Sequence, residues 1–531
     1  MSKRVIINLF LVLFLTIMVL MAVGCGQEAP VSQPGSPGDK SPSPDETGME
    51  KAITVGEAQF PTNMDAALGW NGWYTVKYGI GETLVRLTTD MELEPWLAET
   101  WTQEDDFTWR LQIREGVYFT NGEELTAEKV KASLDRALEL NTRAPSLLDI
   151  QQIEAQGSEL IITTNNPNPA LVSNLTDPLT AIVDADAARE MGDDFAMEPV
   201  MTGPFILTSF VPDEEVIVEK NPDYWGVEAG LDRAIFRLIP DAGTRLMALQ
   251  AGEVQMAVGL PEEAHDVLAR EGNHQIMSQS TARSHILIFN LQKPVFSDKA
   301  VRLAVNKAIN RDDLADKLMK GQGVSARGPF PLVLPFGGDQ LEAYPYDPEK
   351  AAGILDDAGW KPGSNGIRQK GGQKLEFTIV TYAARPELPI IGETIQSQLK
   401  KVGIDVQVSI VDGITDYLKS GDFDASIYSI NTAITGDPQY FLEIFFRTGA
   451  DSNFGGYSNP QMDELINRLT AKFEMPERYE VAREAQQMIL NDAAFAFLVY
   501  PKYSVAVHNN IKGFEIYPSE FYFLFPRMTL E

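Results

Sequence analysis

Residues 375–410 read LEFTIVTYAARPELPIIGETIQSQLKKVGIDVQVSI and predict a strand, a helix and a second strand in succession. Residues 375–381 and 404–410 are short, largely apolar runs of the kind that form strands. Residues 390–402 have the length and spacing of a helix, and Gly403 is a helix stop signal. The stretch therefore predicts a βαβ unit in a protein that mixes strands and helices.

The same mixture of elements recurs on both sides of this unit. Residues 107–113 alternate apolar and polar side chains, as a half-buried strand does. Thr126 is placed to cap a helix whose apolar residues Val130, Leu134 and Leu138 recur every fourth position. Further strands are expected at 53–55 and 254–258, and further helices at 245–250, 298–320, 461–472 and 477–490. The chain of 531 residues is long enough for two or three globular units.

Composition excludes several classes of function. The chain has 44 Lys and Arg against 75 Asp and Glu, a formal charge of −31, which makes a nucleic-acid binder improbable. One cysteine cannot form an intrachain disulfide bond. Four dispersed histidines cannot build a thiolate or multi-histidine metal site by themselves. We therefore expect no cofactor, and no metal held directly by the protein.

The first 50 residues have the composition of a targeting segment followed by a spacer. Lys3 and Arg4 precede an apolar run over residues 5–23, the pattern of a secretory signal. Residues 22–25, Ala-Val-Gly-Cys, resemble the lipobox of bacterial lipoproteins, in which the thiol of Cys25 is acylated. We expect a signal peptide at 1–24 and a disordered Pro/Ser/Gly tether at 25–50. The alternative is an uncleaved membrane anchor; both place the folded part outside the cytoplasm.

Catalytic motifs are missing from the sequence. It contains no G-x-S-x-G, Walker loop, H-E-x-x-H or complete G-x-G-x-x-G pattern. Two distant carboxylates could still meet in a cleft of the glycosidase type, although no motif favours it. We therefore expect a protein that is not an enzyme.

Several motifs, taken in order, resemble one family: the extracellular solute-binding proteins of peptide/nickel-type ABC importers, family 5. They are PWLAETW (95–101), FTWRL (107–111), REGVYFTNGE (114–123), TGPF (202–205), NPDYWG (221–226), ALQAGEV (248–254), FN (289–290), VRLAVNKAI (301–309), YDP (346–348) and AGW (358–360). The resemblance covers the chain from Lys51 to its end.

This resemblance implies an α/β, two-lobed, periplasmic-binding-protein-like fold with a hinge. Lobe I would comprise residues 51–284 with an extra inserted subdomain at about 90–200, lobe II residues 285–502, and residues 503–531 would return to lobe I. Ligand would bind in the cleft, and closure would bury it. The implied partners are the permease and ATPase subunits of an importer. We expect a monomer, lipid-anchored to the outer face of the cell membrane.

Two arginines are the leading ligand-binding candidates. Arg143 is similar to an arginine that contacts the carboxylates of metal chelates in the nickel-type branch. Arg385 matches an Arg-Pro loop at the cleft, which holds the peptide carboxylate in dipeptide binders. A guanidinium suits this task because its planar fork donates two parallel hydrogen bonds to a carboxylate.

The remaining candidates are aromatic and polar. Aromatic cleft walls cover a ligand without demanding polar partners, although core packing is an equal alternative for the loop at 70–74. These candidates are Trp70, Trp73, Tyr74, Tyr428, Asn431 and Thr432.

The segment around residue 434 argues against an ordinary peptide binder. Peptide-binding relatives place an aspartate there to pair with the free amine, and this chain has Ile434. An unpaired buried ammonium would cost on the order of several kcal/mol. Gly436 replaces an aromatic residue found in some nickel-chelate binders, so neither pattern is complete. Asp437 is expected to accept backbone N–H groups at this corner.

The leading hypothesis is therefore an importer's binding lipoprotein. Its cargo would be a small carboxylate-bearing ligand, such as nickel with histidine or an opine-type metallophore. A di- or oligopeptide-binding importer protein is the alternative within the class. A peptide-sensing lipoprotein and a cell-wall hydrolase are alternatives from other classes.

Overall fold

The computed structural model describes residues 50–531 except residue 262. The predicted signal peptide, Cys25 and nearly all of the predicted tether lie outside the described residues. Within the described part, no helix combines the length and apolarity needed to cross a bilayer.

One large sheet carries the fold. Its strand order is β19 (Asp405–Ile410), β18 (Glu376–Thr381), β20 (Ala425–Asn431), β13 (Arg283–Phe289), β21 (Phe495–His508), β11 (Met256–Val258), β1 (Ala52–Glu57), β10 (Arg233–Leu238), β9 (Glu215–Lys220) and β8 (Phe205–Val211). Two more strands, β12 (His274–Ser280) and β14 (Gly323–Ser325), pair with β21. Strand β1 pairs in parallel with β10 and β11, and strand β18 pairs in parallel with β19 and β20.

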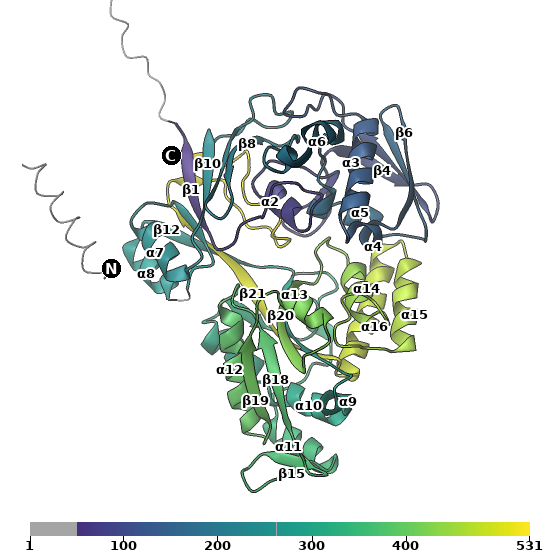
Figure 1. Cartoon of the computed structure of the whole chain (residues 1–531), viewed down its shortest axis with the longest axis vertical. Helices are drawn as coiled ribbons and strands as arrows, with labels where there is room; N and C mark the ends of the chain where they lie inside the picture. Colours follow the sequence, from purple (N-terminus) through teal and green to yellow (C-terminus); the bar gives the residue numbers. More distant parts are fainter. Residues whose placement is uncertain (1–49, 262) are drawn as a thin grey trace, which may run out of the picture. The chain divides into compact units, whose positions relative to one another are not determined.

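Strand β21 divides this sheet into two lobes (Figure 1). Its first residues pair with β13, and its last residues pair with β12 and β11. We call the elements on the β1 side lobe I and those on the β18 side lobe II. Residues 281–282, between β12 and β13, and the middle of β21 are thus two connections between the lobes.

Lobe I contains an inserted four-stranded antiparallel sheet. Its order is β4 (Ala98–Gln103), β5 (Thr108–Ile113), β7 (Glu159–Thr164) and β6 (Ile150–Gln156). Helix α3 (Ala127–Leu140) packs on this sheet, and its buried residues include Val130 and Leu134. Thr126 accepts a hydrogen bond from the Lys129 N–H, which confirms the predicted cap. The predicted strand and helix are both confirmed here.

Shorter elements complete lobe I. They are α2 (Asn71–Lys77), α4 (Ala144–Leu148), α5 (Leu171–Asn174), α6 (Ala185–Met191), α7 (Ala242–Gln250), α8 (Ala264–Glu271), the hairpin β2 (Val85–Leu87) with β3 (Leu93–Pro95), the pair β22 (Ile511–Lys512) with β23 (Thr529–Leu530), and the 3₁₀ turns Pro178–Thr180 and Gly192–Ala196.

Lobe II packs helices on both sides of its part of the large sheet. They are α9 (Pro294–Ser297), α10 (Lys299–Ala308), a π turn at Asp313–Leu318, α11 (Pro348–Asp357), α12 (Glu387–Lys400), α13 (Ile414–Lys419), α14 (Gln439–Phe446), α15 (Pro460–Thr470) and α16 (Met475–Asn491), with a small sheet of β15 (Lys361–Pro362), β16 (Arg368–Lys370) and β17 (Gln373–Lys374) and a 3₁₀ turn at Gly338–Gln340.

The βαβ unit lies at the edge of the large sheet. Strands β18 and β19 pair in parallel, and α12 joins them. Gly403 adopts φ +84° after the helix, as a helix stop does. The helix begins at Glu387, before the predicted start at residue 390. Pro389 lies in its first turn, where a proline costs no intrahelical hydrogen bond.

The single helix predicted at 298–320 is wrong. Helix α10 ends at Ala308, and Ile309 is extended. The reason is a set of polar contacts that apolar spacing does not reveal. The buried Arg311 donates to the carbonyl of Phe497 at 2.5 Å and to the carbonyl of Asn306 at 2.9 Å, while the Asn310 N–H donates to Gln398 at 2.9 Å.

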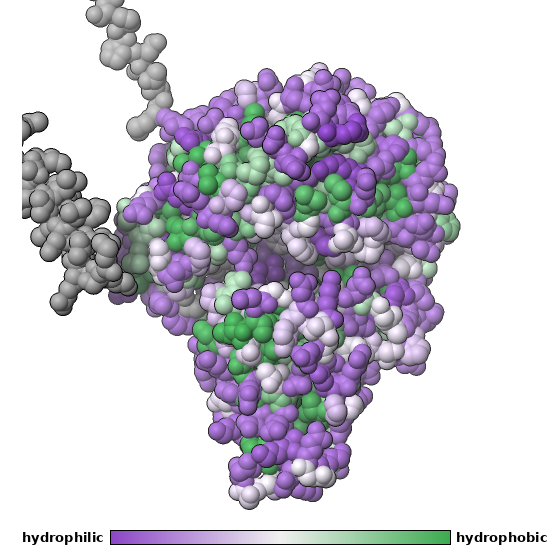
Figure 2. Space-filling view, in the orientation of Figure 1, coloured by the Kyte–Doolittle hydropathy of each residue, from purple (hydrophilic) through white to green (hydrophobic). Residues whose placement is uncertain are grey.

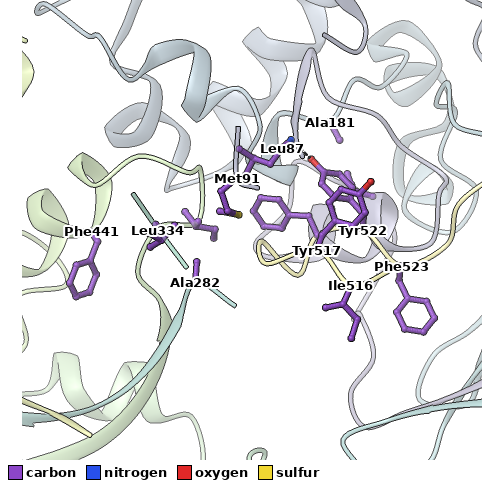
Figure 3. Packing of buried hydrophobic residues seen from close by; sticks show 14 of the residues in the cluster. Leu87, Met91, Ala181, Ala282, Leu334, Phe441, Ile516, Tyr517, Tyr522 and Phe523 are labelled. Atoms are coloured by element: carbon purple, nitrogen blue, oxygen red, sulfur yellow. Dashed lines mark hydrogen bonds between the residues drawn. The ribbon is translucent and has the colours of Figure 1, made fainter. Parts of the chain in front are cut away.

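Apolar contacts also join the two lobes. Figure 3 shows Leu87 and Met91 of lobe I in one buried cluster with Leu334 and Phe441 of lobe II. Tyr522 accepts the Leu87 N–H at 3.2 Å. Gly436 adopts φ +76°, and a side chain there would come within 3.0 Å of Leu87. This corner of lobe II therefore requires glycine, which accounts for the missing aromatic residue.

Candidate ligand-binding site

The surface between the lobes is hollowed, with hydrophilic side chains at the floor of the hollow (Figure 2). The loop after β18, which carries Arg385, faces lobe I across this gap. Gln59 of lobe I donates a 3.4 Å hydrogen bond to the carbonyl of Ala384, the neighbour of Arg385. The sequence candidates fall into two groups, one around Arg143 and one around Arg385.

The Arg143 group forms a shallow recess at the start of α4. Its lining is Gly69, Trp70, Gly72, Trp73, Arg143, Asp177, Pro178 and Leu179. The Arg143 guanidinium carbon lies 3.7 Å from the ring centre of Trp70, a cation–π contact that leaves Trp70 53% exposed. Trp73 packs edge-on against Phe521 at 5.1 Å.

Arg143 already has a carboxylate partner in the chain. Its Nη2 donates to Asp177 at 2.6 Å, and its Nε donates to the Tyr440 hydroxyl of lobe II at 3.3 Å. Burial opposes the charge, but Asp177 and Tyr440 outweigh it and raise the pKa of Arg143. A ligand carboxylate would therefore meet a guanidinium whose charge is partly neutralised.

Arg385 is different. It is half-buried in the loop between β18 and α12, and among the described residues it makes no ion pair and no side-chain hydrogen bond. Its charge acts on two tyrosines of lobe I. Burial raises the pKa of Tyr74 and Tyr503, Glu57 raises it further, and Arg385 lowers it. The guanidinium is thus free to bind an anion, among neutral hydroxyl groups.

Further charged groups lie close enough to Arg385 to feel its charge. Arg283 donates to both oxygens of Glu520, each at 2.9 Å, in a buried bidentate pair. His285 Nε2 lies 3.2 Å from Glu387 Oε1, and Glu387 is the first residue of α12. Burial raises the pKa of Glu387, but the contact with His285 and the charge of Arg385 outweigh it and lower the pKa. Both acids are thus ionised; Glu520 is paired with Arg283, and Glu387 lies against His285.

The remaining candidates are one half-buried aromatic residue and two buried polar residues. Tyr428 is half-buried, 6.1 Å from Tyr382 between ring centres, and its hydroxyl lies 3.3 Å from Thr415 Oγ1. Asn431 donates to the carbonyl of Ser519 and accepts from the Ala433 N–H. Thr432 donates to the carbonyl of Ala282. The polar groups of Asn431 and Thr432 are therefore used by the backbone at the connection between the lobes.

Several residues of this region were not predicted. They are Glu57, Lys77, Arg283, His285, Tyr382, Glu387, Tyr503 and Glu520. Glu387 could have been found, because an acid at a helix start two residues after a candidate arginine is a local signal. The ion pair of Glu57 with Lys77, at 2.7 Å, joins residues 20 positions apart and has no local signal.

The described chain holds no cluster of three or more histidine, cysteine, aspartate or glutamate side chains placed to ligate a metal ion. What it holds at the cleft is the Arg385 guanidinium, whose charge lowers the pKa of Tyr74, Tyr382 and Tyr503 against the larger effect of burial. This arrangement is that of a two-lobed protein that places, between its lobes, a cation without an acidic partner among the described residues.

Comparison with known proteins assigns the family. Residues 92–453 match the family described as bacterial extracellular solute-binding proteins, family 5 Middle. The chain therefore belongs to the extracellular solute-binding proteins of family 5, as the motifs indicated. Members of this family are extracytoplasmic, substrate-binding proteins of ABC importers rather than enzymes.

Three relatives illustrate the range of ligands. The nickel-binding protein NikA of Staphylococcus aureus is 28% identical over 457 residues, covering 86% of this chain and 90% of NikA. Its crystal structure in complex with Ni(L-His)2 superposes with a TM-score of 0.80 at 27% identity, covering 91% of this chain and all of that one.

A nickel ABC transporter structure from Bacillus halodurans is 32% identical, with a TM-score of 0.73, covering 90% of this chain and all of that one. The glutathione-binding protein GsiB of Shigella flexneri is 28% identical over 459 residues, covering 82% of this chain and 86% of GsiB. These similarities confirm the two-lobed α/β fold.

Proposed function

We propose that this protein is the substrate-binding lipoprotein of a peptide/nickel-type ABC importer. It captures a small carboxylate-bearing ligand between its lobes and delivers it to the permease. The observation that carries this proposal is Arg385, a cation at the cleft without a carboxylate partner among the described residues. A charge-assisted, bidentate bond to a ligand carboxylate would complete its coordination.

A metal chelate, such as nickel with histidine, is the favoured cargo. Two of the relatives above carry nickel in their names. Position 434, where a peptide binder would place an acid, holds an isoleucine that is buried in the structure. A free peptide amine would lack a partner there, whereas the amine of a chelating amino acid is occupied by the metal.

We further propose that Cys25 is acylated and that the chain works as a monomer beside its membrane-bound permease and ATPase. The lobe boundaries proposed are 51–284, 285–502 and 503–531, with the subdomain inserted near 90–200. On this proposal the protein performs no catalysis and holds no resident cofactor.

A thermal-shift screen of the refolded, ligand-stripped protein tests the cargo. Binding to the native state alone raises the melting temperature by mass action. We expect a rise with nickel(II) plus L-histidine and none with dipeptides or glutathione. A rise with free peptides alone rejects the chelate and favours the peptide-binding alternative.

Replacing Arg385 tests the site itself. We expect Arg385→Ala to weaken binding of the nickel–histidine probe by about tenfold or more, on the order of 1.5 to 3 kcal/mol for a charge-assisted bond. Arg189→Ala is the matched control, because Arg189 is exposed on α6 and pairs with Asp186 of the same helix. Equal affinities of the wild type and Arg385→Ala, measured by calorimetry, would remove Arg385 from the site.

A further inference from the structure

His285 is a buried titratable group that is not satisfied by its surroundings. It lies in β13 with 0% exposure, and neither ring nitrogen has a well-formed hydrogen bond within the described chain. Its neighbours across the ladder are Ser429 of β20, whose hydroxyl also lacks a partner, and the apolar Val499 of β21. A histidine that served only packing would be expected to have its polar atoms paired.

The imidazole is aimed at the helix start that carries the ligand-binding loop. Its Nε2 lies 3.2 Å from Glu387 Oε1. Glu387 is two residues after Arg385, and the Leu388 N–H donates to the Arg385 carbonyl at 3.1 Å. Leu388 is fully buried. The loop of Arg385 is therefore held to lobe II at two adjacent points, the Leu388 side chain and the Glu387 carboxylate.

The charges that face His285 come from four segments. Glu387 on α12 favours a protonated imidazole, whereas Arg385 before that helix and Arg283 on β13 oppose it. Glu520 of the C-terminal segment neutralises Arg283 through its bidentate contact, and Tyr382 after β18 is held neutral by burial, which raises its pKa. Burial is the largest influence and lowers the pKa of His285. Among the described residues, Arg385 is thus a cation near His285 with which no acid forms a direct ion pair.

We propose that His285 positions Arg385 through Glu387, and that it takes up a proton when a ligand carboxylate neutralises Arg385. This inference rests on the proposed function, because it deepens the role of the same site. Once a carboxylate pairs with Arg385, the repulsion that the imidazolium feels from that guanidinium falls. The protonated imidazole then forms a full ion pair with Glu387, which fixes the loop in the bound position.

The direction of the pH dependence follows from linkage. In the free protein the pKa of His285 is lowered, so the imidazole is neutral above that value. Ligand binding raises the pKa, and the complex holds more protons than the free protein between the two values. Affinity should therefore increase as the pH falls through this window, which lies around and below the ordinary histidine pKa of about 6.5.

A ligand-free experiment tests the coupling directly. The full chain is labelled with ¹³C at its four histidines and titrated by NMR between about pH 5 and 8. The signal missing from His285→Gln identifies His285. We expect its pKa to be higher in Arg385→Gln than in the wild type, because the substitution removes the same charge that a ligand would neutralise. An unchanged pKa of His285 overturns the coupling.

Calorimetry with nickel(II) plus L-histidine then tests the link to binding. Titration near pH 6 in two buffers of different ionisation enthalpy measures proton uptake. The chelate itself titrates, so the value for His285→Gln is subtracted from each of the others. We expect the wild type and His274→Gln to take up a fraction of a proton more than His285→Gln. Near pH 8, His285→Leu should bind about tenfold more weakly than the wild type, and His285→Gln, which keeps a donor toward Glu387, should bind more tightly than His285→Leu.

Equal proton uptake in the wild type and His285→Gln overturns the inference even if the probe binds tightly. If the probe does not bind at all, the proposed cargo is wrong. In that case the NMR titration still decides, since a raised pKa in Arg385→Gln supports the coupling and an unchanged one rejects it.

Discussion

Glu82 is a fully buried acid whose partners are neutral side chains. Its Oε2 accepts hydrogen bonds from Thr202 at 2.8 Å and Trp225 at 2.9 Å, and its Oε1 accepts one from Tyr224 at 2.7 Å. Burial raises its pKa from 4.5 to about 7, against the opposing effect of these bonds. The carboxyl therefore keeps its proton in the folded protein at pH values where the unfolded chain has lost it.

This shift predicts a pH-dependent free energy of unfolding. Between pH 4.5 and about 7 the folded state binds more protons than the unfolded state, so stability falls as the pH rises. The loss is about 3 kcal/mol across the window, at 1.36 kcal/mol per unit. Glu82→Gln keeps the size of the side chain and can still form hydrogen bonds. Its free energy of unfolding should therefore lack this decrease with rising pH. Denaturant unfolding near pH 5 and pH 8 measures it.

The control for Glu82 is Glu115→Gln, an exposed acid of the same lobe. Its unfolding should depend on pH as that of the wild type does. If Glu82→Gln and the wild type lose stability equally between the two pH values, the carboxyl is ionised in the folded protein and the assignment is wrong.

Single residues were predictable where the motif carried the chemistry. Arg385 is predictable because an Arg-Pro loop matches a family pattern, and Arg143 because it resembles an arginine of the nickel-type branch. The Asp177 partner of Arg143 was not predicted, because the two residues are 34 positions apart and no local pattern links them. Asn431 and Thr432 were chosen for their polarity, and their side chains bond to the backbone, which sequence does not show.

At the scale of elements, the corner before α14 is held by one buried ion pair. Arg478 of α16 is 0% exposed and donates to Asp437 through Nε at 3.0 Å and through Nη2 at 2.7 Å. Asp437 also accepts the Gln439 N–H at 2.8 Å, which confirms its expected role at the corner. The pair fastens α14 to the helical hairpin of α15 and α16.

Breaking this pair should destabilise lobe II. Asp437→Asn leaves the guanidinium of Arg478 buried without a counter-charge, and the expected cost is about 3 to 5 kcal/mol in the free energy of unfolding. The double variant Asp437→Asn with Arg478→Met removes both charges and should cost less than the sum of the single changes. Denaturant unfolding of the three variants measures this, and additive costs would show that the two residues are not coupled.

Elements with a clear period were predicted well, and those broken by long-range contacts were not. The βαβ unit followed from apolar runs and Gly403, and it is confirmed in the structure. The helix expected at 298–320 breaks at Ile309, because Arg311 bonds to the carbonyl of Phe497, a residue 186 positions away. The apolar spacing continues through the break, so no local pattern could reveal it.

At the scale of the whole molecule, the order of strands in the large sheet could not be predicted from local sequence patterns. Strand β1 pairs with β10, so that Ala52 lies opposite Arg233, and β21 joins both lobes from the end of the chain. The two-lobed architecture was predicted only through the family resemblance. The composition could not indicate it, since a charge of −31 describes solubility rather than fold.

The proposed lipid attachment of the molecule depends on its single cysteine. Cys25 follows an apolar run that begins after Lys3 and Arg4, and a thiol there is the acceptor that the lipobox pattern requires. Two acyl chains bind a bilayer stably, whereas one chain binds only reversibly. We expect a palmitate analogue to label the wild type in growing cells and to leave Cys25→Ser unlabelled. Cys25→Ser should also move from the membrane fraction to the medium.

Because the chain has no other cysteine, any thioester or thioether label in the wild type reports on position 25 alone. An uncleaved apolar anchor would instead keep Cys25→Ser in the membrane at the mass of the full chain. The measurement is therefore cell fractionation, followed by detection of the labelled band by fluorescence. Retention of unlabelled Cys25→Ser in the membrane would contradict the lipid anchor and indicate a transmembrane anchor. Either result shows how the protein is attached to the membrane, where the permease that it is proposed to supply would lie.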